Sequence, residues 1–189
     1  MSAPRFTTDL LDWSAWIKPV DIDAASAQQL AVLEESGPHA RTSQYYHLLL
    51  HDAPALRERS HLFNAIMFAR EGLPRADREL GATVESILNG CVYCTSVHAR
   101  LYVQLAKRAD VIERLFAHGL AAELAPRERA IADFSAKLAE TPPRAGASEI
   151  GALREAGLSD ADIVDLVNAV AMFAWANRLM LTLGEPKRS

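Results

Sequence analysis

The sequence predicts an all-α fold, and three observations lead to that prediction. Runs of β-branched residues with period-two alternation are missing from the chain. Glycine or proline closes almost every segment whose apolar residues recur at helical spacing. Half of the 189 residues are hydrophobic, which is enough for one domain of ordinary size to bury a substantial core. We therefore expect a single-domain array of several helices.

The expected helices follow these glycine and proline signals in chain order. They span residues 23–36, 43–52, 55–72, 74–90, 91–105, 109–119 and 126–140. Pro126 is placed as a first-turn proline, and Thr141-Pro142-Pro143 breaks the helix that it starts. A last helix begins at Ser159, which forms a capping box with Asp162, and ends at Gly184-Glu185-Pro186. Its apolar residues recur at helical spacing, so we expect this helix to be central to the core.

Charge and apolar patterning argue against two kinds of partner. The formal net charge is −4, and Lys and Arg are scattered, so we expect no nucleic acid. Residues 1–21 carry acidic residues early and lack a continuous apolar run, so they do not resemble a signal peptide. The apolar stretch 163–183 is interrupted by polar residues at positions 165, 168, 177 and 178, which a lipid-facing span would tolerate poorly. We expect a cytoplasmic protein without a membrane segment.

Both cysteines of the chain lie at the start of one expected helix, in the segment "NGCVYCTSVHARLY". A turn of about 100° per residue places Cys91, Cys94 and His98 on one stripe. Asn89-Gly90 separates this helix from the preceding one, so both cysteines fall within its first turn. The positive end of the helix dipole there favours the thiolate form. His98 stands four residues after Cys94, where it could accept or return a proton. Cys91 is placed to attack a sulfenic acid on Cys94 and close a disulfide.

A carboxylate partner is expected on the preceding helix. Glu79 and Glu85 flank its apolar stripe on opposite edges. Periodicity alone does not say which of the two glutamates faces the cysteines.

The spacing of these residues resembles a known superfamily. Glu79, eleven residues, Cys91-Val92-Tyr93-Cys94, three residues and His98 match the E-x11-C-x-x-C-x3-H pattern of redox members of the alkylhydroperoxidase D and carboxymuconolactone decarboxylase superfamily. Residues 157–186, with the pair Asn177-Arg178, look like the closing segment of its peroxidase-related branch. The resemblance covers residues 40 to 186.

This resemblance implies an all-helical, homo-oligomeric protein, a dimer or larger, that reduces hydroperoxides by a dithiol/disulfide cycle without a bound cofactor. By position, Cys94 would be the peroxidatic thiol and Cys91 the resolving thiol. His98 would be the proton acceptor, and Glu79 rather than Glu85 the end of a relay that reaches His98 directly or through water. A dithiol protein or lipoyl-type compound would be the reductant. One departure is Tyr93, where the best-studied members have a histidine, which affects the expected rate and reductant.

Two alternative functions remain at this point. Cys91, Cys94 and His98 supply ligand types that zinc accepts, so a zinc-binding or redox-sensing module is one. Its fourth ligand would be Glu79 or water, and the second cysteine pair of a structural zinc site is missing. The other is an enzyme of the decarboxylase branch that acts on a lactone acid, although members of that branch generally lack the cysteine pair.

The domain organisation follows from where the helical array begins. Trp13, Trp16 and Ile17 either belong to an arm that lies on a partner subunit or are part of the core. We expect residues 1–24 to form such an N-terminal arm, because this segment precedes the compact helices. Residues 25–189 are expected to form one alkylhydroperoxidase D-like helical domain.

Overall fold

The prediction of an all-α fold is confirmed by the structure, a computed structural model that describes residues 5–188. The helices are α1 (Ala27–Ser36), α2 (Gln44–Leu49), α3 (Ala53–Met67), α4 (Arg75–Leu88), α5 (Val92–Ala106), α6 (Asp110–His118), α7 (Pro126–Ala139), α8 (Ala147–Glu155) and α9 (Asp160–Leu183). Two short strands, β1 (Leu11–Ala15) and β2 (Gly184–Arg188), pair antiparallel. Short 3-10 turns lie at Ile22–Ala24, Pro38–Arg41, Leu50–Asp52 and Gly119–Ala121.

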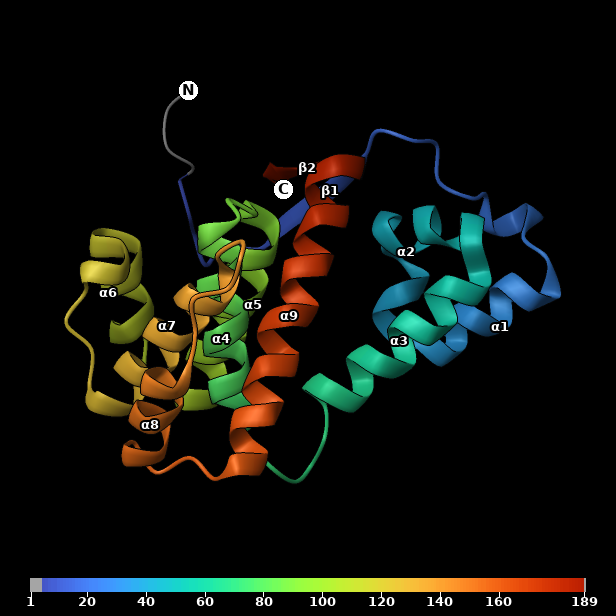
Figure 1. Cartoon of the computed structure of the whole chain (residues 1–189). Helices are drawn as coiled ribbons and strands as arrows, with labels where there is room; N and C mark the ends of the chain where they lie inside the picture. The colour runs from blue at the N-terminus through green and yellow to red at the C-terminus, as the bar shows by residue number, and fades with distance from the viewer. Residues whose placement is uncertain (1–4, 189) are drawn as a thin grey trace.

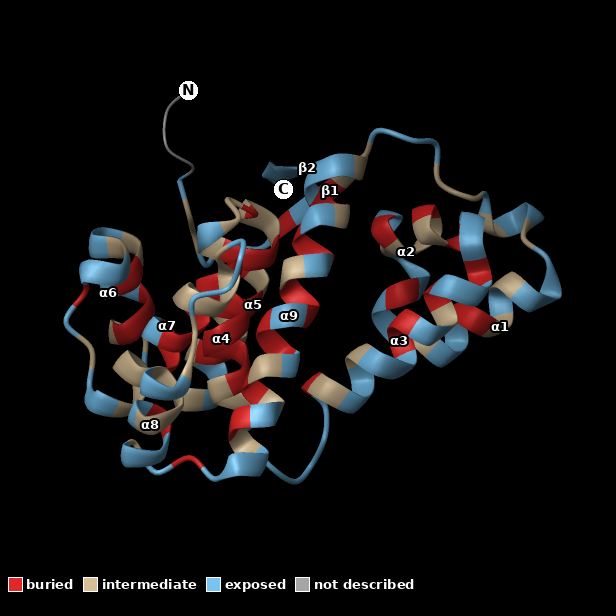
Figure 2. Ribbon diagram, viewed as in Figure 1, coloured by how far each residue is buried: buried red, intermediate tan, exposed pale blue. Residues whose placement is uncertain are grey.

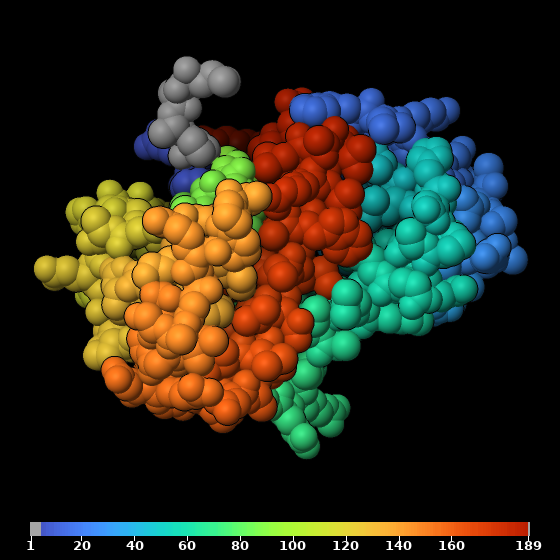
Figure 3. Space-filling view, in the orientation of Figure 1, coloured from blue at the N-terminus to red at the C-terminus, as the bar shows by residue number. Residues whose placement is uncertain are grey.

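Helix α4 lies at the centre of the fold. It contacts α5, α7 and α9, and nine of its residues are buried (Figure 2). Figure 1 shows α9 running between the group α4–α8 and a second group made of α1, α2 and α3. The main apolar core lies between the helices of the first group and α9, and α3 joins the second group to α9 through contacts around Phe173. The space-filling view shows the two groups flanking the surface of α9 (Figure 3).

Helix α9 confirms the expected capping box. The Ser159 hydroxyl accepts a hydrogen bond from the Asp162 amide at 3.2 Å, and the Asp162 carboxylate accepts one from the Ser159 amide at 2.9 Å. By length and composition, α9 is the one helix among residues 5–188 that could cross a membrane. It packs against α3, α4 and α7, and a buried core helix passes the same test.

A buried arginine fixes the connection between α3 and α4. Arg78 is fully buried and ion-paired with Asp165 of α9 at 3.1 Å. Its guanidinium also donates to the main-chain carbonyls of Ile66, Ala69 and Glu71 at 2.7–3.1 Å. Gly72 has a φ of +79°, and a Cβ there would lie 2.1 Å from an Asp165 carboxylate oxygen. Glycine is therefore needed at this turn, which anchors the end of α3 to both α4 and α9.

Two elements differ from the sequence expectation. Helix α8 was not expected, because it is only nine residues long and its N-cap, Gly146, has no side chain; the Glu149 carboxylate caps the Gly146 amide instead. The β1–β2 pair joins the two ends of the chain, with Ala15 opposite Gly184. A Cβ at Gly184 would lie 2.3 Å from the Ser14 carbonyl oxygen, so the ribbon depends on this glycine. Local periodicity does not reveal pairing between such distant segments.

Part of the expected N-terminal arm packs on the helices of its own chain. Trp13 is buried, and its indole Nε1 donates to the Met180 carbonyl at 3.2 Å. Its ring meets Tyr45 edge-on at a centroid distance of 5.6 Å. Trp16 and Ile17 are exposed. Residues 1–4 of the arm lie outside the described residues, and the boundary at residue 24 stays a prediction.

Candidate active site

The turn between α4 and α5 places both cysteines at a helix start, as the Asn-Gly signal indicated. Gly90 has a φ of +70°, which reverses the chain after α4. Cys91 is the N-cap of α5, and its amide donates to the Ser86 carbonyl at 2.9 Å. Cys94 follows in the first turn, with its amide among those that have no partner within the helix.

The two thiols are free, buried and in contact. Their sulfur atoms are 2.8 Å apart, which is the distance of a hydrogen bond between them. This hydrogen bond lowers the pKa of Cys91, whereas burial, together with the same hydrogen bond, raises the pKa of Cys94 well above its ordinary value. The pair therefore loses its first proton more readily than an isolated thiol and holds the second more tightly.

An aromatic and apolar cluster surrounds the thiols. It draws on β1, α2, α5 and α9, and its buried members are Trp13, Tyr45, Leu48, Cys91, Cys94 and Met180. Tyr46 and Tyr93 pack against this cluster from its edge. Burial raises the pKa of Tyr45 to about 12 and raises that of Tyr93 as well, so both hydroxyls are neutral near pH 7.

Glu79 of α4 and His98 of α5 form a second buried pair, and His98 lies one helix turn after Cys94. The His98 Nδ1 and Glu79 Oε2 atoms are 2.6 Å apart, and the Glu79 side chain is fully buried. Arg75, one turn earlier on α4, donates from Nε to Glu79 Oε1 at 2.6 Å. Burial acts to raise the pKa of Glu79, but the charges and hydrogen bonds of His98 and Arg75 outweigh it and hold that pKa below its ordinary value. Glu79 is therefore an ionised acceptor that fixes the His98 ring.

Glu85 occupies a different environment from Glu79. Its Oε1 accepts from the Asn89 side-chain amide at 2.6 Å, and its Oε2 is buried without a partner among residues 5–188. Burial raises the pKa of Glu85. The structure thus brings Glu79, and not Glu85, to His98, which periodicity alone left open.

The expected contact between His98 and Cys94 is not formed. His98 has no hydrogen bond to either sulfur among the described residues, because its ring is turned toward Glu79 and lies edge-on against Phe173, with centroids 4.1 Å apart. The i,i+4 spacing correctly places both residues in the buried part of α5 but does not determine this orientation. A proton moving between Cys94 and His98 needs a bridging group or a change of rotamer.

Two arginines at the site were missed at the sequence level. Arg75 donates a hydrogen bond to Glu79, and its guanidinium lies 4.2 Å above the Phe68 ring centroid. Arg59 of α3 is 7% exposed and lies 5.3 Å from the ring centroids of Tyr45 and Tyr46. The i,i+4 spacing of Arg75 and Glu79 was a readable signal for the first. Arg59 had none, because its neighbours come from another helix.

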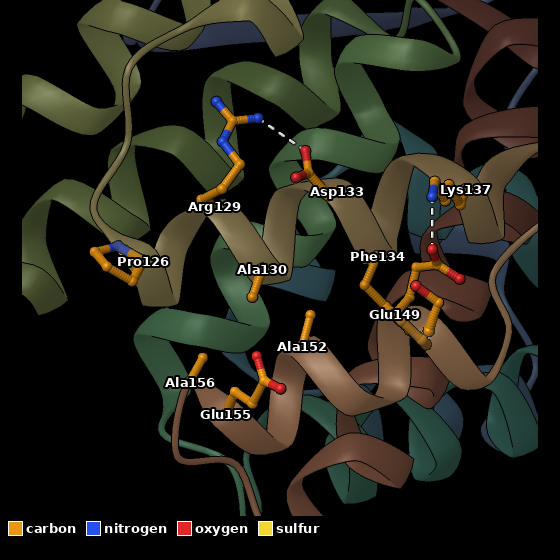
Figure 4. Close-up of a pocket in the computed structure, with 11 residues that line it drawn as sticks. Pro126, Arg129, Ala130, Asp133, Phe134, Lys137, Glu149, Ala152, Glu155 and Ala156 are labelled. Atoms are coloured by element: carbon orange, nitrogen blue, oxygen red, sulfur yellow. Dashed lines mark hydrogen bonds and ion pairs between the residues drawn. The ribbon is translucent and has the colours of Figure 1, made fainter.

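A surface groove lies apart from the cysteine cluster, and no candidate metal site adjoins that cluster among residues 5–188. Among residues 5–188, no group of three or more His, Cys, Asp or Glu side chains is placed to hold a metal ion. A groove of about 380 Å³ lies between α7 and α8 (Figure 4). Ion pairs Arg129–Asp133 and Lys137–Glu149 line it, and none of its lining residues belongs to the cysteine cluster.

The fold and site define an all-helical protein with a buried dithiol at one helix start and an adjacent glutamate–histidine pair. A model of the carboxymuconolactone decarboxylase family matches residues 54–137. An alkylhydroperoxidase D core, a peroxidase-related protein from Ralstonia eutropha JMP134, is 26% identical over 90% of each chain, with a TM-score of 0.75. A peroxidase-related protein from Silicibacter sp. TM1040 is 27% identical over 76% of this chain and 73% of its own, with a TM-score of 0.65. These similarities support the alkylhydroperoxidase D-like and carboxymuconolactone decarboxylase superfamily for this chain.

The same fold occurs with another activity. The debrominase Bmp8 is 16% identical over 89% of this chain and 90% of its own, with a TM-score of 0.72. A comparison with curated proteins found no match. The reaction of this protein must therefore be argued from its site and not from its fold.

Proposed function

We propose that this protein is a thiol-dependent peroxidase that reduces hydrogen peroxide or an organic hydroperoxide. The observation that carries the proposal is the pair of free thiols, Cys91 and Cys94, with sulfur atoms 2.8 Å apart at the start of α5. A disulfide bond is about 2.05 Å long, so a small side-chain movement would close it. The similarity to two peroxidase-related proteins supports the same reading.

The proposed cycle uses each thiol once. Because the first proton leaves Cys91, the proton of Cys94 moves across the 2.8 Å contact to Cys91 before the attack. The Cys94 thiolate so formed attacks one peroxide oxygen, the O–O bond breaks, and the leaving oxygen takes a proton to become an alcohol or water. Cys94 is now a sulfenic acid, which the Cys91 thiol attacks to form a disulfide with release of water. A dithiol protein or lipoyl-type reductant then transfers two electrons and two protons to restore both thiols.

His98 and Glu79 have the proposed role of proton relay. The ionised Glu79 accepts from Nδ1–H, so Nε2 of the neutral His98 ring is free to accept a proton, and the protonated ring can then return it. The fixed ring contacts Phe173 and not a sulfur atom, so the relay reaches the thiol by rotation or through water. Residues Cys94, Cys91, His98 and Glu79 are the proposed catalytic set.

The function is tested by peroxide turnover with an excess of dithiol reductant. Cys94→Ser should abolish turnover, whereas Cys91→Ser should still react once with peroxide at Cys94. The opposite pattern, with Cys94→Ser turning over at the wild-type rate, would show that the assignment is wrong. A variant of the first-turn residue Thr95, Thr95→Ser, serves as a control, because it keeps a hydroxyl beside Cys94 in α5.

A homo-oligomer is the proposed assembly. Val164, Ala171 and Trp175 are exposed and lie on one face of α9 by their spacing of seven and four residues. Large exposed apolar side chains grouped on one face are typical of protein interfaces.

A further inference from the structure

Arg59 is a buried cation without a carboxylate partner among residues 5–188. Its side chain extends from α3 and is 7% exposed. The described ion pairs do not include it, and its Nε atom is buried without a hydrogen-bond partner in that part of the chain. A buried charge is costly unless it is paired, so an ionisable group of opposite charge is expected nearby.

Aromatic rings compensate part of this charge. The guanidinium carbon lies 5.3 Å from the ring centroids of Tyr45, Tyr46 and Phe63. Its Nη1 donates a long hydrogen bond of 3.4 Å to the Tyr46 hydroxyl. Ring faces and a long hydrogen bond to a hydroxyl stabilise a cation, but they do not supply an opposite charge.

The same tyrosines pack against the dithiol. Tyr45 belongs to the cluster that contains Cys91 and Cys94, and Tyr46 packs against it, so the two rings beside Arg59 are shared with the cysteine site. Cys91 of the same helix raises the pKa of Cys94, and the charge of Arg59 of α3 lowers it. Cys94 in turn raises the pKa of Tyr45 of α2 and of Tyr93 of α5. Both tyrosines are neutral at pH 7, which leaves a thiolate as the available anion.

We propose that Arg59 is the counter-ion of the Cys94 thiolate, a positioning residue that stabilises the negative sulfur from its place beside Tyr45 and Tyr46. This inference rests on the proposed function only in taking Cys94 as the reacting thiol. The charge of Arg59 lowers the pKa of Cys94 in opposition to burial, which raises it. Arg59 does not touch the peroxide in this scheme; it sets the fraction of Cys94 that is ready to attack.

A second consequence concerns the redox equilibrium. Oxidation to the Cys91–Cys94 disulfide removes the negative sulfur and leaves Arg59 without its counter-ion. Stabilisation of the reduced form makes a disulfide more oxidising. Loss of the Arg59 charge should therefore make the disulfide harder to reduce.

The test measures the pKa of Cys94 through its rate of alkylation by iodoacetamide against pH, in a Cys91→Ser background. Arg59→Met should raise the apparent pKa of Cys94 by about one unit, and Arg59→Lys should restore most of the lower value. Arg57→Met is the matched control. Arg57 lies on the same helix but binds Glu35 at 2.7 Å, so the same change in net charge should leave the pKa of Cys94 unaltered.

An unchanged pKa of Cys94 in folded Arg59→Met would overturn the proposal, and so would an equal rise in Arg57→Met. Circular dichroism establishes folding, and Arg59→Gln replaces Arg59→Met if the latter does not fold. A titration of the Cys91–Cys94 disulfide against a glutathione buffer gives a second readout, in which Arg59→Met should require a more reducing buffer. Neither measurement uses peroxide, so failure here is distinct from failure of the peroxidase assignment.

Discussion

Glu79 and His98 join α4 to α5 through a 2.6 Å hydrogen bond between two buried side chains. Arg75 holds the other carboxylate oxygen, so the glutamate has a partner on each side. Glu85, six residues later on the same helix, is equally buried but bonds only to Asn89. The two glutamates are therefore a matched pair with different environments, and they allow the role of the relay to be measured.

We expect Glu79→Gln to slow peroxide turnover and Glu85→Gln to leave it nearly unchanged. The glutamine cannot hold a positive His98 ring, so proton transfer loses efficiency; a positioned acid–base group contributes about 10²–10⁴-fold. Replacing only its orienting carboxylate should cost less than the loss of the whole group, about tenfold. Stopped-flow oxidation of the reduced protein by peroxide measures the effect. Equal rates for both variants would remove Glu79 from the mechanism.

Stability should respond to pH with opposite signs at the two glutamates. The folded-state pKa of Glu79 is lowered, so its stabilising contribution is present above the unfolded value near 4.5 and is lost as pH falls through the folded pKa. The folded-state pKa of Glu85 is raised, so this group destabilises the folded state as pH rises above the unfolded value near 4.5. Urea unfolding at pH 3 to 7 measures both contributions by comparison with the glutamine variants.

At pH 7, Glu79→Gln should lower the free energy of unfolding and Glu85→Gln should raise it. Both differences should shrink in the acidic range. A Glu79→Gln variant that is as stable as wild type across the range would contradict the ion-pair description.

The dithiol should titrate in two separated steps. The hydrogen bond between the sulfurs lowers the pKa of Cys91, and burial raises that of Cys94, so one thiolate per chain should form below the ordinary value of 9.0 and the second well above it. Thiolate absorbance near 240 nm follows both steps. The single variants Cys91→Ser and Cys94→Ser should each lose this separation. Two equivalents released together near pH 9 would contradict the shared proton.

Replacement of an exposed tryptophan should affect assembly and leave the fold intact. Trp175 is 43% exposed on the outer face of α9, so Trp175→Ser is expected to weaken subunit association with a small effect on unfolding. Light scattering after size-exclusion chromatography measures the mass. Glu58→Ser, an exposed change on α3, is the control. A wild-type protein that is monomeric at all concentrations would contradict the proposed homo-oligomer.

Local patterns predicted the helices and the inward stripe of α5 well. Cys91, Cys94 and His98 all lie in the buried part of that helix because helical phase is a property of adjacent residues. Side-chain rotamers, in contrast, depend on contacts with distant segments. The orientation of the His98 ring is set by Glu79 and Phe173, which come from two other helices. The choice of Glu79 over Glu85 came from family spacing, and the structure supplied its geometric reason.

The elements that sequence reasoning missed depend on contacts between distant segments. Arg59 gains its significance from Tyr45 and Tyr46, and an isolated arginine on α3 would be taken for a surface charge. The β1–β2 ribbon pairs the two ends of the chain, and Gly184 is required only because Ser14 and Trp13 lie against it. Such relationships follow from packing and not from periodicity.

The most direct test of the central claim is to locate the first oxygen that peroxide delivers. Reduced wild-type protein, Cys91→Ser and Cys94→Ser are treated with one equivalent of hydrogen peroxide, trapped with dimedone and digested for mass spectrometry. We expect wild type to yield an intramolecular Cys91–Cys94 disulfide and Cys91→Ser to yield a dimedone adduct on Cys94. An adduct on Cys91 in the Cys94→Ser protein, with none on Cys94 in Cys91→Ser, would reverse the assigned roles. Absence of any adduct or disulfide in all three proteins would contradict the peroxidase itself.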